Sequence, residues 1–158
     1  AYPEAVQAIL AADLIVAGPG SLFTSVLPNL LVPDLLAAVQ ASRAVKVYVC
    51  NVATQHGETT GFSVDDHVAA LERHTLPGLF PLVLANNRQP PNAPARTQWV
   101  RLEEPERAGV TVADLIDEQS LWRHDPAKLA QALIDLLHRN SPSSRNGHRP
   151  SQPLPVKS

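Results

Sequence analysis

Two loops of this chain combine glycines with hydroxyl and amide side chains directly after short apolar runs. The first, Gly18 to Ser25, reads GPGSLFTS. Its two glycines allow a ligand to approach the backbone, and free N–H groups at a following helix N-terminus attract phosphate. The loop lacks the Gly-Lys-Ser/Thr of a Walker A loop, the third glycine of a dinucleotide-binding loop and the Gly-x-Ser-x-Gly of a hydrolase elbow. It predicts either an anion-binding turn or a tight strand-to-helix turn capped by Ser21.

The second loop, Asn51 to Phe62, reads NVATQHGETTGF and is dense in amides and hydroxyls. Glu58 is its one carboxylate, and its glycines stand at positions 57 and 61. Binding residues are often carried on loops that a rigid scaffold positions, whereas a connector with no task rarely needs so many donors. The loop therefore predicts a binding role, and the alternative is a solvated glycine-rich turn.

Other candidate residues carry weaker signals, and we predict neither a catalytic residue nor a metal site. His67 and His74 are seven residues apart, about 10 Å along a helix, too far apart for one ion, so we expect surface or core-edge histidines. Cys50 ends an apolar run and is expected to be a small buried hydrophobe. Asp65 and Asp66 suit the first turn of a helix. Arg123 could clamp a phosphate or could be an ordinary surface arginine.

The elements that must position these loops follow a βαβ rhythm. Apolar runs at 14–17, 45–50 and 79–85 predict three strands about 30 residues apart. Predicted helices cover 3–12, 33–39 and 63–74, the last with Ser63 as cap and Asp66 as its acidic partner. Further along, we expect a strand at 98–102, a short helix at 111–116 capped by Thr111, and a helix from Asp125 through Leu137. The sum is a three-layer α/β/α domain over residues 1–140 with a mostly parallel sheet, whose carboxyl edge carries both loops.

Composition and charge exclude several classes of protein. The 158 residues hold 13 Lys plus Arg, 15 Asp plus Glu, one cysteine and no methionine, for a net charge of −2. There is no basic footprint for nucleic acid or an anionic membrane, no disulfide scaffold or zinc cluster, and no apolar run long enough for a membrane span, so we expect a cytoplasmic protein. Residues 141–158 are rich in proline, serine and basic residues and predict a disordered tail. The absence of methionine and the few predicted strands suggest that N-terminal sequence is missing.

Two long motifs resemble the YvcK-type gluconeogenesis factor family, within the superfamily of the phospholactate transferase CofD. The first is ADLIVAGPGSLFTS at 12–25, followed by PNLLV at 28–32. The second is VYVCNV at 47–52, followed by Thr54-Gln55, Gly57-Glu58-Thr59, Gly61-Phe62 and Asp66-His67. Arg123-His124-Asp125 also matches the family pattern at the opening of the last helix. The likeness runs from about Pro3 to Leu137.

The resemblance implies a Rossmann-like fold and a cytoplasmic protein that binds a UDP-activated sugar such as UDP-N-acetylglucosamine. The implied role is control of carbon flow, cell-wall synthesis and cell shape, without an established reaction or a required cofactor. It implies that the chain is the C-terminal half of a protein about twice as long, whose N-terminal half would be a partner in the fold. Carried over by position, Gly18, Pro19, Gly20, Ser21 and Thr24 line the pyrophosphate or sugar side, Asn51, Thr54, Gln55 and Glu58 face them, and Arg123 supplies positive charge.

The family pattern is not matched everywhere, and other functions stay open. Ala17, Ala53 and His56 depart from it beside the motifs, which leaves ligand details open. The alternative function is a transferase that moves a phospholactyl-type group from a guanosine-activated donor to a deazaflavin, with magnesium held by Glu58 or Asp66. A third is an interaction module that binds no small ligand. A homo-oligomer also stays open.

Overall fold

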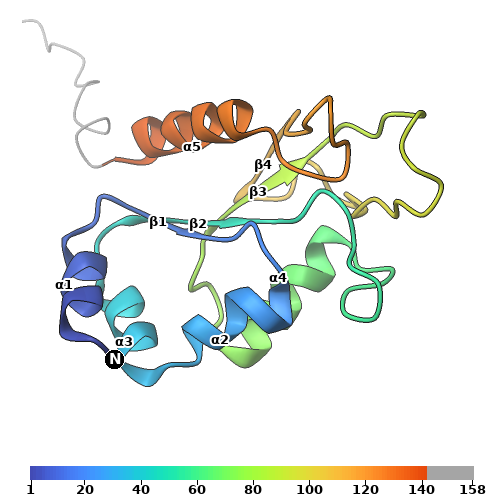
Figure 1. The fold of residues 1–158 in the computed structure, drawn as a ribbon. Coiled ribbons are helices and arrows are strands. Elements are labelled where there is room, and N and C mark those ends of the chain that lie inside the picture. Colours follow the sequence, from blue (N-terminus) through green and yellow to red (C-terminus); the bar gives the residue numbers. More distant parts are fainter. Residues whose placement is uncertain (142–158) are drawn as a thin grey trace, which may run out of the picture.

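A computed structural model describes residues 1–141 of the chain. Its four strands are β1 (Leu14–Ala17), β2 (Val45–Val49), β3 (Leu82–Asn86) and β4 (Val110–Ala113). They form one sheet in the spatial order β1-β2-β3-β4, and every neighbouring pair is parallel (Figure 1). The prediction of a parallel sheet is confirmed. The predicted disordered tail lies outside the described residues, except for Ser141 at the end of the last helix.

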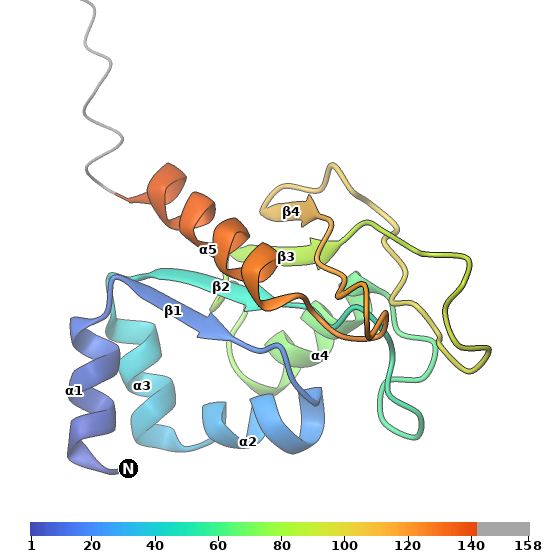
Figure 2. The ribbon, with the colours of Figure 1, turned by 45° about the horizontal axis from the view of Figure 1, so that its top comes forward.

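Helices cover both faces of this sheet. One face carries α1 (Pro3–Ala11), a single π-helical turn η1 (Leu22–Val26) that continues as α2 (Leu27–Leu30), α3 (Pro33–Ala41) and α4 (Val64–His74). The other face carries α5 (Pro126–Asn140), which Figure 2 shows crossing above β2 and β3. The expected three-layer α/β/α architecture is therefore confirmed. No single helix within residues 1–141 is long and apolar enough to cross a membrane; η1–α2 with α3 reach that length and composition only as a pair bent by 75°.

Local sequence explains how the two amphipathic helices begin. Ser63 and Asp66 form the predicted capping box, in which the Asp66 N–H donates to the Ser63 hydroxyl and the Ser63 N–H donates to the Asp66 carboxylate. Asp125 caps α5 by accepting from the N–H groups of Ala127 and Lys128, with Pro126 in the first turn.

Alternation along the strands divides the core between the two faces. Tyr48 and Cys50 point toward α3 and α4, in a cluster that also holds residues of η1 and α2. Val47 and Val49 point the other way and pack with Leu136 of α5. Cys50 is fully buried, as expected. Each fully buried Val or Leu contributes roughly 1.5–3 kcal/mol to stability.

Two predicted elements are wrong and a third is shifted. The expected helix at 111–116 is strand β4, because the β-branched run Val110 to Val112 pairs with β3 in the register Val83↔Val110. The expected strand at 98–102 makes only single bridges, Trp99 with Ala53 and Arg101 with Ser63. The third strand begins at residue 82 instead of 79, after Pro81, which has no N–H to offer a ladder.

Candidate functional site

The two glycine-containing loops meet at the carboxyl edge of the sheet, and Asn51 joins them. The Gly20 N–H donates to Asn51 Oδ1 at 3.1 Å, and Asn51 Nδ2 donates to the Gly20 carbonyl at 3.0 Å. Two reciprocal bonds fix the distance and the relative orientation of the loops. Only glycine fits at position 18, where φ is +88° and an added Cβ would lie 2.7 Å from the Val49 carbonyl oxygen.

The Glu58 carboxylate lies against the turn that follows β1. Its Oε1 accepts the N–H groups of Phe23 at 2.8 Å and Thr24 at 3.0 Å, and its Oε2 accepts the Ser21 hydroxyl. Ser21 and Thr24 also share a hydrogen bond between their hydroxyls. Two N–H groups expected to be free for phosphate are therefore occupied by an anion of the protein itself, because a carboxylate satisfies the N-terminal amides as a phosphate would.

A cleft of about 500 Å³ opens beside the joined loops. Five of the ten predicted site residues line it: Gly20, Ser21, Asn51, Thr54 and Gln55. The other lining residues are two more from the second loop, Val52 and Ala53, and five from two later segments, Pro94, Arg96, Thr97, Trp122 and His124. This volume is within the range of small-molecule sites. A neighbouring hollow of about 470 Å³ shares Thr54 and Arg96 and adds His56 and Gln98.

The other predicted residues lie outside this cleft. Gly18 and Pro19 line a separate groove on the β1 side. Thr24 and Glu58 bond the two loops together. Arg123 is exposed in the turn before α5 and is not among the residues that line the cleft, although Trp122 and His124 on either side of it are.

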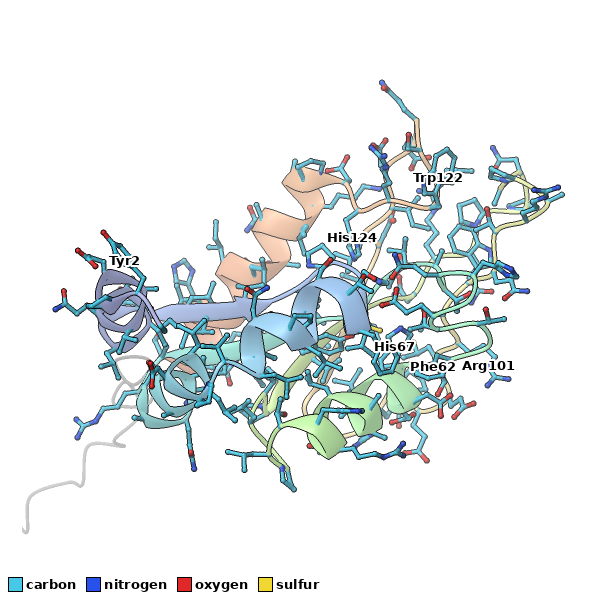
Figure 3. All side chains as sticks on the ribbon, turned by 60° about the horizontal axis from the view of Figure 1, so that its bottom comes forward. Tyr2, Phe62, His67, Arg101, Trp122 and His124 are labelled. Carbon is cyan, nitrogen blue, oxygen red and sulfur yellow. The ribbon has the colours of Figure 1, made fainter. Side chains whose placement is uncertain are left out.

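The cleft residues that could not be recognised from the sequence pattern come from two segments without hydrophobic periodicity. Pro94, Arg96 and Thr97 belong to the long connection between β3 and β4, which carries no local signal of a site. Trp122 and His124 lie on the segment that leads into α5 (Figure 3). In the sequence their one signal is adjacency to Arg123; only the structure shows that Trp122 stays 49% exposed.

Backbone pairing holds these segments against the loops. The Thr54 N–H donates to the Gln98 carbonyl at 2.7 Å, which ties the second loop to the β3–β4 connection. His124 forms an antiparallel bridge with Ile116, and the Asp125 N–H donates to the Leu115 carbonyl at 2.8 Å. Leu115 and Ile116 are fully buried, so the turn that presents His124 is anchored in the core.

Two polar atoms at the cleft are buried without a partner, Gln55 Oε1 and His124 Nε2. Burial lowers the pKa of His124 below its ordinary value, and a hydrogen bond to the Cys50 backbone opposes this shift. The imidazole is therefore neutral at neutral pH. A buried polar atom without a partner costs free energy, so this pair favours a ligand that supplies hydrogen-bonding groups.

The end of the second loop packs in an aromatic cluster of Phe23, Phe62 and His67. Phe62 packs edge-on against Phe23 and His67, with ring centroids 6.4 and 5.4 Å apart. The expectation of a surface or core-edge position is wrong for His67, which is fully buried and donates from Nδ1 to the Ser63 carbonyl at 2.7 Å. Burial lowers the pKa of His67. His74 is exposed, as expected.

The fold and the cleft define a Rossmann-like α/β protein with a binding site at the carboxyl edge of a parallel sheet. The chain belongs to the CofD family, because the family model described as 2-phospho-L-lactate transferase CofD matches residues 1–139. The resemblance found in the sequence is thereby confirmed.

Gluconeogenesis factors are among its relatives. The gluconeogenesis factor of Bacillus subtilis is 40% identical over 146 residues, which cover 85% of this chain and 46% of that protein. The gluconeogenesis factor of Listeria innocua is 42% identical over 144 residues, covering 86% and 45%. The crystal structure of a UPF0052 family protein from Bacillus halodurans superposes with a TM-score of 0.76 at 38% identity, covering 83% and 46%. The chain therefore spans about half the length of these relatives.

Proposed function

We propose that this chain is the ligand-binding part of a regulatory factor of carbon metabolism, and that its ligand is a nucleoside-diphosphate sugar such as UDP-N-acetylglucosamine. The observation that carries the proposal is the cleft beside the Gly20–Asn51 junction, a space of ligand size that is lined by Gln55 and His124, each of which holds a buried polar atom without a partner. The gluconeogenesis factors among its relatives support the regulatory role.

The cleft supplies the chemistry that such a ligand needs. Arg96 offers a guanidinium for a diphosphate. Thr54 and Gln55 offer a hydroxyl and an amide for sugar hydroxyls. The exposed ring of Trp122 offers an apolar face for a planar base. Arg123 would supply further positive charge, as the resemblance implies.

The class of ligand indicates where in the cell the protein would act and which process it would regulate. Sugar nucleotides of this kind are made and used in the cytoplasm, where we place the protein. Because they feed cell-wall synthesis, sensing their concentration would couple carbon flow to wall growth and cell shape.

Calorimetric titration of the full-length protein with UDP-N-acetylglucosamine and, separately, with guanosine diphosphate tests this proposal. We expect binding of the uridine ligand and a raised melting temperature. A ligand at a hundredfold excess over its Kd stabilises a protein by about 2.7 kcal/mol. Binding of the guanosine ligand alone would contradict the proposal. No binding of either would favour the interaction-module alternative.

The second candidate function is a transferase of the phospholactate type, which the description of the family model favours. The residues expected to hold its magnesium do not fit that role. Glu58 is engaged by the turn after β1, and Asp66 accepts the N–H and hydroxyl of Ser63 in the capping box. Within residues 1–141, no group of three His, Cys, Asp or Glu side chains converges on a metal position. Guanosine diphosphate binding that depends on magnesium would support this second function.

A further inference from the structure

The cleft and its neighbouring hollow share part of their walls. Thr54 and Arg96 line both the cleft of about 500 Å³ and the hollow of about 470 Å³. The other residues that line the hollow are His56 of the second loop and Gln98 of the connection between β3 and β4. A ligand that contacts the shared wall can therefore extend into both spaces at once.

Pairing of two backbone segments builds this shared wall. The Thr54 N–H donates to the Gln98 carbonyl at 2.7 Å, next to the antiparallel bridge between Ala53 and Trp99. Residues that stand opposite each other in antiparallel segments hold their side chains on the same face. The Thr54 hydroxyl accordingly donates to Gln98 Oε1 at 3.3 Å. The backbone thus fixes the positions of these two side chains before any ligand binds.

The charges around the two spaces favour an anion at the shared wall. Acidic residues outnumber basic ones in the chain, 15 to 13, yet no Asp or Glu among residues 1–141 lines either space. Within the same residues, the guanidinium of Arg96 has neither an ion-pair partner nor a hydrogen-bond partner. A guanidinium binds phosphate oxygens through its parallel N–H groups. The diphosphate at the centre of a sugar nucleotide therefore belongs at Arg96.

The two spaces differ in the chemistry of their remaining walls. The cleft has apolar surface from Val52, Pro94 and the ring of Trp122, against which a planar base can pack. The hollow has the imidazole of His56 and the amide of Gln98, which offer donors and acceptors for hydroxyl groups. In the described part of the chain, the Gln98 amide nitrogen has no acceptor. An uncharged, hydroxylated group therefore suits the hollow.

We propose that the hollow is the subsite for the sugar of the ligand, with the diphosphate at Arg96 and the base in the cleft beside Trp122. This inference rests on the proposed function and adds to it which space receives each part of a nucleoside-diphosphate sugar. His56 and Gln98 then determine specificity for the sugar, because they line the hollow and not the cleft. Gln55, which lines the cleft alone, serves the ribose.

Calorimetric titration of the full-length protein with UDP-N-acetylglucosamine and with UDP measures what the hollow contributes. We expect the sugar nucleotide to bind at least about tenfold more tightly than UDP, because UDP has no group that reaches the hollow. His56→Ala and Gln98→Leu should each lower this ratio of affinities severalfold. Arg96→Met should weaken both ligands by a similar factor, about ten- to a hundredfold, because they share the diphosphate.

Matched controls and a second readout keep the test decisive. Gln119→Leu and His138→Ala, at exposed positions that line neither space, should leave the ratio unchanged. A ratio near one in the wild-type protein, or a ratio that neither His56→Ala nor Gln98→Leu changes, would overturn the assignment of the hollow and leave the proposed function standing. Binding of neither ligand would contradict the proposed function, and the assignment with it. Melting temperatures without ligand identify a misfolded variant, in which case the other hollow variant decides.

Discussion

The carboxylate of Glu58 accepts the N–H of Phe23 at 2.8 Å, although the two residues are 35 positions apart. Through this contact the second loop supplies the carboxylate that satisfies N–H groups of the first loop, at the start of η1. The two loops are therefore one structural unit.

Replacing Glu58 by glutamine tests this unit. Glu58→Gln removes the charge that the N–H groups of Phe23 and Thr24 face. Hydrogen bonds to charged groups contribute about 1.5–3 kcal/mol, so we expect a loss of that order in the free energy of unfolding, measured by urea denaturation. Glu106→Gln, at an exposed position, is the control and should change stability little. Equal stability of the two variants would show that the contact contributes nothing.

The unpartnered oxygen of Gln55 predicts a separation between stability and binding. The substitution Gln55→Leu removes the buried, unpartnered side-chain oxygen, so we expect the free energy of unfolding to stay unchanged or to rise. Affinity for UDP-N-acetylglucosamine should fall about tenfold, equivalent to 1.4 kcal/mol, because the ligand loses its partner. Calorimetry and urea denaturation measure the two quantities. Gln131→Leu on the exposed face of α5 is the matched control. Unaltered affinity would remove Gln55 from the site.

Two buried histidines predict a stability that falls in mild acid. Burial lowers the pKa of His67 and of His124 in the folded state, whereas unfolded histidine titrates near its ordinary value of about 6.5. The unfolded chain thus binds more protons, so stability is full above that value and decreases as the pH falls below it.

The measurement is the free energy of unfolding between pH 7.5 and 5. His67→Asn, which retains a donor for the Ser63 carbonyl, should flatten the decrease, while the exposed His138→Asn should not. A wild-type stability that is constant over this range would contradict the assignment.

Alanine substitutions at Gly18 and Gly57 distinguish the cost of a left-handed backbone conformation from the cost of a steric clash. Both have positive φ, but an added Cβ at Gly18 meets the Val49 carbonyl oxygen, whereas one at Gly57 meets no atom within 4 Å. Gly57→Ala should cost about 1–2 kcal/mol for the left-handed conformation alone. Gly18→Ala should cost at least about 1 kcal/mol more, because the contact forces the backbone to move. Thermal or urea unfolding checks both, and equal losses would contradict the close approach.

Much of the fold could be predicted from the sequence. The helices at 63–74 and from Asp125 onward were recognisable because their caps and apolar stripes involve residues within a few positions of each other. The prediction of a helix at 111–116 was wrong because the structure of this segment depends on a residue contact that is distant in the chain. Val110 to Val112 form a strand because β3 lies beside them, and that neighbour is not visible in the local sequence.

The candidate site divides in the same way. Its glycine-containing loops, with Asn51 and Gln55, were identified from residue type and from their position after apolar strands. Arg96, Trp122 and His124 were not identified as site residues, because they come from irregular segments that reach the cleft only after the chain has folded.

The sequence by itself determined the helix caps, the parallel strand rhythm and the two polar loops, since hydrogen bonding and hydrophobic periodicity act between near neighbours in the chain. The tertiary structure alone decided which strands pair, which anion satisfies the turn after β1 and which distant side chains complete the cleft. Those outcomes depend on contacts between segments tens of residues apart, and only packing around the shared core brings such segments together.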